Sequence, residues 1–401
     1  MATTMYGLSR ALLAALALLA AGCTAAERPV RPSQAAATAG DPGSVAAAPP
    51  VGTNAAATGD DAWQQRWDAV LAGARQEGKV VMAVPAEVAD EYRAMLGSVG
   101  ARYGFAVEAR AINASEVTQV VMRECSMGRQ TLDVLQGGLS EAFDVYPQGC
   151  LAPLKPQLIL PEVTDPQNWR DGTLKFDDPE GAYMLQLGEA VYGPVAYNTE
   201  RVQPEQISTS RDLLKPEFKG KITSYDPRRA GTGRGLSTYF LTTLGPDYVR
   251  QLYQGQEVAS IADHRQLAES IARGAYWVGL AHVERGVEPL RREGLPIGIR
   301  ELEDAPGYVT GGSTVVKIVN NAPHPNAATV LVNWLASRDG QKAMMEVLGQ
   351  PSRRVDVAVP DSVAPYRLPK PGVDYADGYD FDFYTKTRPQ AEQAVLEILS
   401  R

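Results

Sequence analysis

A short loop rich in arginine and glycine contains the residue types that point most directly to ligand chemistry. It comprises Arg228, Arg229, Gly231, Thr232, Gly233 and Arg234. Glycines let backbone N–H groups approach a ligand, a helix start favours negative charge, and a guanidinium holds a carboxylate or phosphonate through two parallel hydrogen bonds. The loop therefore predicts a site for a small organic anion, or for a metal carried with one. A glycine-rich turn with solvated arginines is the alternative, and the sequence favours neither.

Further candidate ligand-binding residues lie elsewhere in the chain. Glu87 follows one apolar stretch, and Gly138 and Ser140 follow another, where glycine allows the backbone to approach a ligand. Tyr192 and Tyr308 could stack on a ligand, with core packing as the alternative role of each ring. These five residues complete the predicted ligand-binding set apart from one histidine.

Residues for metal binding or catalysis are sparse. His282 and Glu284 could ligate a metal, but two residues do not make a site, and a lone histidine is more often structural. The sequence has no Gly-x-Ser-x-Gly motif, and neither His264 nor His324 has an evident serine or cysteine partner. We therefore expect a binding protein that is not an enzyme, with no cofactor and no assigned metal.

Helices that alternate with short apolar strands must position these residues. Strands are predicted at 79–84, 105–109, 132–135, 221–224, 276–281 and 313–319, and an extended run at 190–197. Helices are predicted at 63–76, 85–95, 117–127, 212–218, 235–244, 325–336 and 340–348. This alternation predicts a mostly parallel sheet with helices on both faces. The roughly 340 residues from Trp63 onward suit two α/β lobes, with a ligand cleft between them.

Several collinear stretches resemble the iron(III)-type extracellular solute-binding proteins of ABC transporters, which have the two-lobed type II periplasmic-binding fold. These stretches are 74–81, 196–199, 212–222, 226–233, 321–328 and 334–341. The resemblance covers residues 63–357 and implies capture of a solute by lobe closure and its delivery to an ABC permease and ATPase. Iron-binding members usually carry adjacent tyrosines where this chain has Ala281 and His282, which counts against iron.

The same resemblance suggests the division of the chain. We expect lobe 1 to comprise 63–192 and the return 311–401, which includes a C-terminal tail, and lobe 2 to comprise 193–310. The hinge would lie near Tyr192-Gly193-Pro194 and Gly311-Gly312. The expected ligand is an organic anion, or ferric iron with an anion. A receptor for a sensor or chemotaxis system, or a secreted hydrolase, is the alternative function. The net charge of −8 and the absence of a basic run argue against nucleic acid as a partner.

The N-terminus has the order of an export signal. Arg10 precedes an apolar run at 11–21, and residues 19–23 resemble the lipobox of bacterial lipoproteins, with Ala20 in place of the usual leucine. Residues 1–22 are thus a predicted signal peptide, and Cys23 is predicted to carry lipid that anchors the protein to a membrane, in the periplasm or at the cell surface. An ordinary signal peptide with an incidental cysteine is the alternative. Residues 23–61, rich in Ala, Pro, Gly and Thr, are a predicted disordered tether.

The cysteine count follows from this assignment. With Cys23 carrying lipid, only Cys125 and Cys150 remain, and in an oxidising compartment they can form a disulfide. Neither shows the spacing of a redox or zinc motif. Two separate buried thiols are the alternative.

Mass spectrometry of the mature protein without reduction tests both assignments. We expect the chain to begin at an acylated Cys23, and we expect reduction to add the mass of two hydrogens at Cys125 and Cys150. An unmodified Cys23 would contradict the lipoprotein assignment, and free thiols before reduction would contradict the disulfide.

Overall fold

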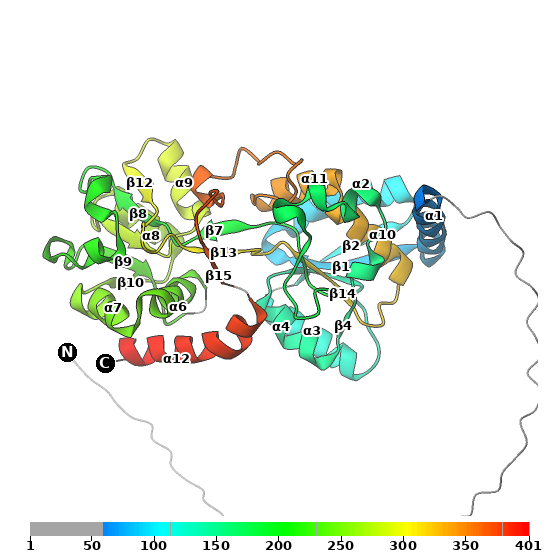
Figure 1. The fold of residues 1–401 in the computed structure, drawn as a ribbon, viewed down its shortest axis with the longest axis horizontal. Coiled ribbons are helices and arrows are strands. Elements are labelled where there is room, and N and C mark those ends of the chain that lie inside the picture. Colours follow the sequence, from blue (N-terminus) through cyan, green and yellow to red (C-terminus); the bar gives the residue numbers. More distant parts are fainter. Residues whose placement is uncertain (1–58, 113, 230, 379, 401) are drawn as a thin grey trace, which may run out of the picture. The chain divides into compact units, whose positions relative to one another are not determined.

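Two mixed β-sheets covered by helices, and a small sheet formed where the chain passes between them, make up the described structure (Figure 1). This computed structural model describes residues 59–112, 114–229, 231–378 and 380–400. The predicted signal peptide, Cys23 and nearly all of the predicted tether lie outside the described residues. Among the described helices, none is long and apolar enough to cross a bilayer.

The first sheet has seven strands in the order β2-β1-β3-β14-β6-β5, with β4 beside β14. Their bounds are β1 Lys79–Pro85, β2 Ala106–Ile112, β3 Val134–Gly137, β4 Leu151–Ala152, β5 Lys175–Phe176, β6 Leu185–Gln186 and β14 Val315–Val319. The accompanying helices are α1 Gly59–Glu77, α2 Ala89–Tyr103, α3 Ala114–Ser126, α4 Ser140–Val145, α5 Pro161–Thr164, α10 Pro325–Ala336 and α11 Arg338–Leu348.

Strand β1 shows why this sheet needs helices on both faces. Val80, Met82 and Val84 belong to one apolar core, together with residues of α10. Val81 and Ala83 alternate with them and belong to a second core, together with residues of α3. Because side chains alternate across a strand, a continuous apolar run such as β1 is stable only where both faces are covered.

The second sheet has five strands in the order β10-β9-β11-β8-β12. Their bounds are β8 Val195–Asn198, β9 Ile222–Tyr225, β10 Ala259–Ile261, β11 Val278–Leu280 and β12 Ile297–Arg300. The helices that follow or cover these strands are α6 Thr232–Leu244, α7 Pro246–Arg250, α8 His264–Ala272, α9 Glu284–Arg292 and the C-terminal α12 Arg388–Leu399. On β8, Val195 and Tyr197 face the core shared with α6 and α7, whereas Ala196 faces the core of α8 and α9.

Both sheets are mixed, whereas the sequence predicts a mostly parallel sheet. Strands β1, β2 and β3 are parallel, but β14 is antiparallel to β3, β4 and β6. Likewise β9, β10 and β11 are parallel, but β8 is antiparallel to β11 and β12. The chain reaches β8 and β14 directly from the crossing strands and not through a covering helix, so the connection does not force parallel pairing.

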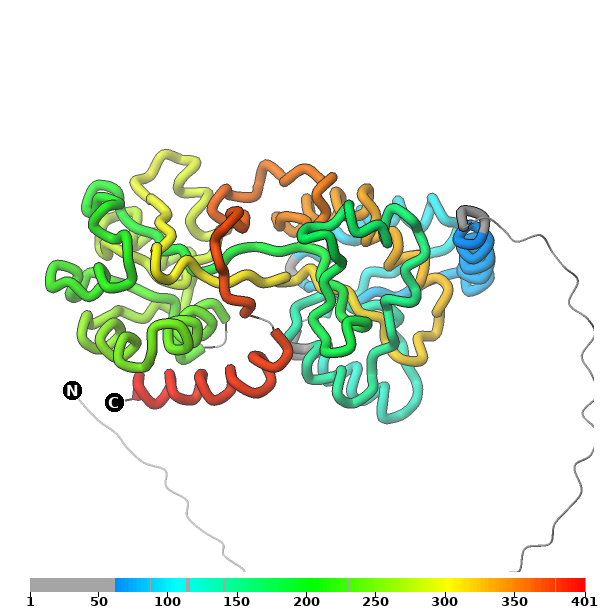
Figure 2. Tube along the Cα trace, in the orientation of Figure 1, coloured from blue at the N-terminus to red at the C-terminus, as the bar shows by residue number. Residues whose placement is uncertain are grey.

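Two crossing strands connect the sheets, and both are followed in Figure 2. Strand β7 (Ala190–Tyr192) leads to β8, strand β13 (Tyr308–Thr310) leads to β14, and the two pair antiparallel. They approach closely at Gly193 and Gly307, which both have a φ of 125°. A Cβ atom on Gly307 would lie 2.2 Å from the carbonyl oxygen of Tyr192, and one on Gly193 would lie 2.6 Å from Cα of Gly307. Only glycine fits at either position.

The C-terminal segment contacts elements of both sheets (Figures 1 and 2). Strand β15 (Ala376–Asp377) pairs with β13. Phe381 and Tyr384 pack against Phe143 of α4, and α12 packs against α6 and α7. The sequence predicts that 311–401 is the return of lobe 1 with a C-terminal tail, but it predicts neither this strand nor α12.

The helix predicted at 212–218 differs from the structure, whereas the predicted disulfide agrees with it. The predicted helix at 212–218 consists of two short 3-10 helices, Ser210–Leu214 and Pro216–Phe218, because Pro216 cannot continue a helix. The predicted disulfide between Cys125 and Cys150 is present, with Cα atoms 5.7 Å apart, and it connects the end of α3 to the start of β4.

The close approach of the crossing strands predicts that the stability of the fold depends strongly on glycine at position 307. We expect Gly307→Ala to lower the free energy of unfolding by about 2 kcal/mol or more, because the substitution combines left-handed strain with a backbone clash. Gly97→Ala is the control, since Gly97 is exposed within α2 and no atom lies within 4 Å of its added Cβ. Chemical unfolding of both variants checks this, and equal stabilities would contradict the role of Gly307.

Candidate ligand-binding site

Two cavities open near the carboxyl ends of the parallel strands, where ligands of open α/β sheets bind. The first, which we call the α6 cavity, has a volume of about 520 Å³ and includes the start of α6. The second, which we call the α9 cavity, has a volume of about 490 Å³ and includes the start of α9. Tyr192 and Gly312 line both cavities, so the two spaces meet at the crossing strands.

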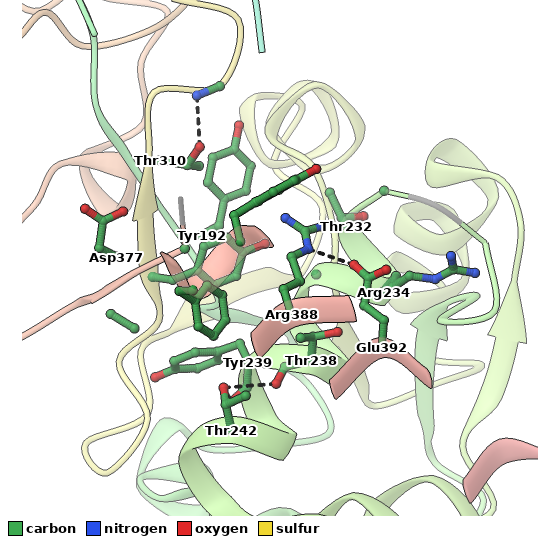
Figure 3. A pocket seen from close by; sticks show the side chains of 18 residues that line it. Tyr192, Thr232, Arg234, Thr238, Tyr239, Thr242, Thr310, Asp377, Arg388 and Glu392 are labelled. Atoms are coloured by element: carbon green, nitrogen blue, oxygen red, sulfur yellow. Dashed lines mark hydrogen bonds and ion pairs between the residues drawn. The ribbon is translucent and has the colours of Figure 1, made fainter. Parts of the chain in front are cut away.

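The α6 cavity combines aromatic rings with hydroxyl groups (Figure 3). The rings of Tyr192 and Tyr308 stack with centroids 5.9 Å apart, and Tyr239 lies 5.7 Å from Tyr308. The hydroxyl oxygen of Thr238 is buried and makes no hydrogen bond within the described structure. A buried hydroxyl without a partner is costly, so this wall of the cavity favours a ligand that can bond to it.

The start of α6 is shaped to receive negative charge. Gly231 precedes the helix with a φ of 117°, and no side chain caps the first turn. The Thr232 hydroxyl donates instead to the carbonyl oxygen of Ala281, 2.8 Å away, and ties the helix start to the end of β11. A Cβ on Gly233 would lie 2.3 Å from the carbonyl oxygen of Tyr225, so this glycine allows α6 to begin against β9. The first N–H groups of a helix lack intrahelical acceptors and attract anions.

The predicted arginines do not act together. Arg228 donates to both carboxylate oxygens of Asp226, at 2.9 and 3.1 Å, and its side chain is 58% exposed. Burial would raise the pKa of Asp226, but the hydrogen bonds from Arg228 bring that pKa below its ordinary value. Arg229 is exposed, and neither arginine lines the two cavities. Arg234 does line the α6 cavity, and its guanidinium donates to the backbone carbonyl groups of Pro227 and Arg228.

The predicted ligand-binding residues from the first part of the chain are Glu87, Gly138 and Ser140. The side chains of Glu87 and Ser140 lie outside the described part of the structure. The carbonyl oxygen of Gly138 accepts a hydrogen bond of 2.9 Å from the buried ammonium group of Lys317, and Gly138 lines neither cavity. Pro85, at the end of β1, and Ser313 line the α9 cavity in their stead.

His282 lies where the two cavities meet. A small space there is lined by Tyr192, Thr232, Ala281, His282, Tyr308, Tyr366 and Arg367, among others. Both ring nitrogens of His282 are buried, and within the described structure the only polar group beside them that favours the protonated ring is the backbone of Pro194. Burial, together with the positive charge of Arg367, lowers the pKa of His282 to about 4. The imidazole is therefore neutral at physiological pH. The described residues contain no group of three or more His, Cys, Asp or Glu residues arranged to hold a metal ion.

The structure thus brings Tyr192, Thr232, Arg234, His282 and Tyr308 to one region and leaves Arg228 and Arg229 outside it. Sequence reasoning missed Thr238, Tyr366 and Arg367. Thr238 carries a weak signal, because it lies one helical turn after Arg234 on the same face of α6. The tail residues Tyr366 and Arg367 carry none, because they reach the region only through the path of the C-terminal segment.

The depressed pKa of His282 predicts a pH dependence. Between pH 6.5 and about 4 the unfolded chain binds a proton at this residue but the folded chain does not, so stability falls as the pH decreases through this window. We expect this loss to be smaller in His282→Gln than in the wild type. NMR titration of the ring, combined with unfolding measurements at each pH, checks this. A ring that titrates near 6.5 would contradict the buried neutral state.

Residues 187–346 match the family model of bacterial extracellular solute-binding proteins. An uncharacterized protein of Haemophilus influenzae is 25% identical over 180 residues, which are 42% of this chain and 50% of that protein. The match therefore spans half the length of this curated relative.

Solved structures match over more of the chain. The Trichodesmium protein IdiA (FutA), in complex with iron and citrate, is 18% identical with a TM-score of 0.62, and the match covers 80% of this chain and 99% of that one. Iron-bound HitA of Pseudomonas aeruginosa is 15% identical with a TM-score of 0.60, over 80% and 99%. AfuA of Actinobacillus pleuropneumoniae, with fructose-6-phosphate bound, is 17% identical with a TM-score of 0.53, over 80% and 97%.

At these identities the structural likeness establishes the fold alone, and it confirms the predicted fold class. The described chain has the α/β fold of the periplasmic binding proteins, with mixed sheets. Residues 187–346 are similar to the bacterial extracellular solute-binding proteins, a class of binding proteins and not of enzymes.

Proposed function

We propose that this protein is the substrate-binding lipoprotein of an ABC import system, and that it captures a small organic anion, or ferric iron with an anion. The observation that carries the proposal is the start of α6, which no side chain caps and which lines a cavity of about 520 Å³. An anion placed there would accept hydrogen bonds from the backbone N–H groups and would be stabilised by the positive end of the helix dipole. The lipid anchor on Cys23 would hold the protein near its permease.

The chemistry around the helix start supports an anion with a polar, hydroxylated body. Arg234 supplies positive charge, and the buried Thr238 hydroxyl is available as a hydrogen-bond partner. The rings of Tyr192 and Tyr308 offer flat apolar faces beside these polar groups. The proteins of similar fold have bound iron with citrate and fructose-6-phosphate, and both citrate and the phosphate ester are anions.

The binding mechanism that we propose is lobe closure. Lobe 1 carries the first sheet and lobe 2 carries the second sheet, on which α12 packs, so the predicted return 311–401 does not belong to lobe 1 throughout. The crossing at Gly193 and Gly307 would allow one lobe to rotate against the other. A ligand that contacts both lobes only in the closed form binds that form more tightly, and this difference in affinity drives closure.

Calorimetric titration with citrate, other dicarboxylates, phosphorylated sugars, aminophosphonates and ferric citrate tests the function. We expect one member of this panel to bind stoichiometrically without turnover. Gly235→Val should weaken its binding by about tenfold or more, because even a Cβ at this position would lie 2.9 Å from the hydroxyl of Tyr308 and a larger side chain would fill the α6 cavity. Gly255→Val is the control, since Gly255 is exposed in a helical segment away from the cavity.

Small-angle scattering of the same samples tests closure. We expect the radius of gyration to decrease when the ligand identified by calorimetry is added. A protein that binds none of these anions would contradict the proposed function. Binding without a decrease in the radius of gyration would contradict lobe closure but not the proposed function.

A further inference from the structure

The C-terminal segment contains a buried arginine, Arg367, that lies where the α6 and α9 cavities meet. Arg367 closes the short 3-10 helix η10 (Pro365–Arg367) and is only 5% exposed. It lines both the α9 cavity and the small space beside His282. This residue lies beyond residues 187–346, the part of the chain that matches the family model.

The guanidinium of Arg367 is incompletely bonded for a buried cation, although its side chain hydrogen-bonds with that of Tyr192. It lies over the ring of Tyr192, 4.0 Å from the centroid. Its Nη2 donates to Gln350 over a long distance of 3.4 Å. Its Nε is buried without a hydrogen bond, and the nearest carboxylate oxygen of Glu284 is 3.7 Å from it. Because a buried charge is costly unless it is paired and hydrogen-bonded, these contacts leave room for a further acceptor.

The backbone that carries Arg367 is fixed in place. The N–H of Ala364 donates to the other carboxylate oxygen of Glu284 at 2.7 Å, and the side chains of Val363 and Ala364 are buried. Gln350 and the Tyr192 ring hold the far end of the side chain. An arginine held in this way is already oriented for a ligand, so less conformational entropy is lost on binding.

The other charges of the α9 cavity do not compete equally with Arg367. Arg285, Arg292 and Glu346 are exposed, and Glu288 is already paired with Arg291. Exposed charges are screened by water and salt, whereas a buried guanidinium is screened much less. Glu284 is partly buried and is the carboxylate that faces Arg367 most closely.

We propose that Arg367 is a ligand-recognition residue that binds a carboxylate or phosphate group entering from the α9 cavity. Glu284 is its internal counter-ion, and the anionic group of the ligand replaces Glu284 as the partner of the guanidinium. The inference rests on the proposed function, since it takes the ligand to be an anion. It adds a residue from the C-terminal segment to a site otherwise built from the two sheets.

Titration with citrate and with inorganic phosphate tests this assignment, since both offer the required oxyanions. We expect Arg367→Gln to weaken binding of the anion that the wild type prefers by about tenfold or more, the effect of losing a charge-assisted hydrogen bond. The affinity of Arg367→Lys should lie between those of the wild type and Arg367→Gln, because an ammonium group keeps the charge but not the geometry for two parallel hydrogen bonds. Arg229→Gln, a change at an exposed arginine that lines neither cavity, should bind like the wild type.

A substitution at Glu284 gives an effect of opposite sign. We expect Glu284→Gln to tighten anion binding by about threefold or more, because it removes the competing charge while its amide oxygen still accepts from Ala364. Thermal unfolding shows whether each variant is folded. If Arg367→Gln does not fold, Arg367→Lys and Glu284→Gln decide the question.

The outcomes separate this inference from the proposed function. Unchanged affinity in the Arg367 variants and in Glu284→Gln would overturn the role of Arg367 and leave the proposed function standing. A wild-type protein that binds neither citrate, phosphate nor any other anion of the panel would overturn both.

Discussion

The contact between Gly193 and Gly307 is the constraint on which the candidate site depends. At this point the two crossing strands approach so closely that no Cβ fits on either residue. Their pairing places the Tyr192 and Tyr308 rings against each other. It also provides the edge on which β15 forms. The cavities beside α6 and α9 share Tyr192 because it lies on this crossing, so the ligand site is built outward from a backbone contact.

Much of the fold could be predicted from the sequence because its signals are local. The apolar run of β1, the glycine loop before α6 and the two final helices of the first sheet each depend on a short pattern of residues. Strand direction could not be predicted in the same way. Strands β8 and β14 run antiparallel to their neighbours because of the path by which the chain reaches them, and no short pattern records that path.

The candidate site shows the same limit at the level of single residues. Thr232 and Arg234 could be predicted because a glycine-rich helix start is a local signal. Arg228 was predicted with them, but Asp226, two residues earlier, offers it a carboxylate, and the local pair forms instead. Arg367 could not be predicted, because more than a hundred residues separate it in sequence from Tyr192 and only the folded tail brings them together.

The route of the C-terminal segment also has a mechanical consequence. Its aromatic residues pack on α4 beside the first sheet, and β15 pairs with the crossing strand β13. Helix α12 packs on α6 and α7 beside the second sheet. A rotation of one sheet against the other must therefore stretch or slide this segment. If the lobes rotate as proposed, the length of this segment would limit how far they separate, and breaking its contacts would add to the free energy of opening.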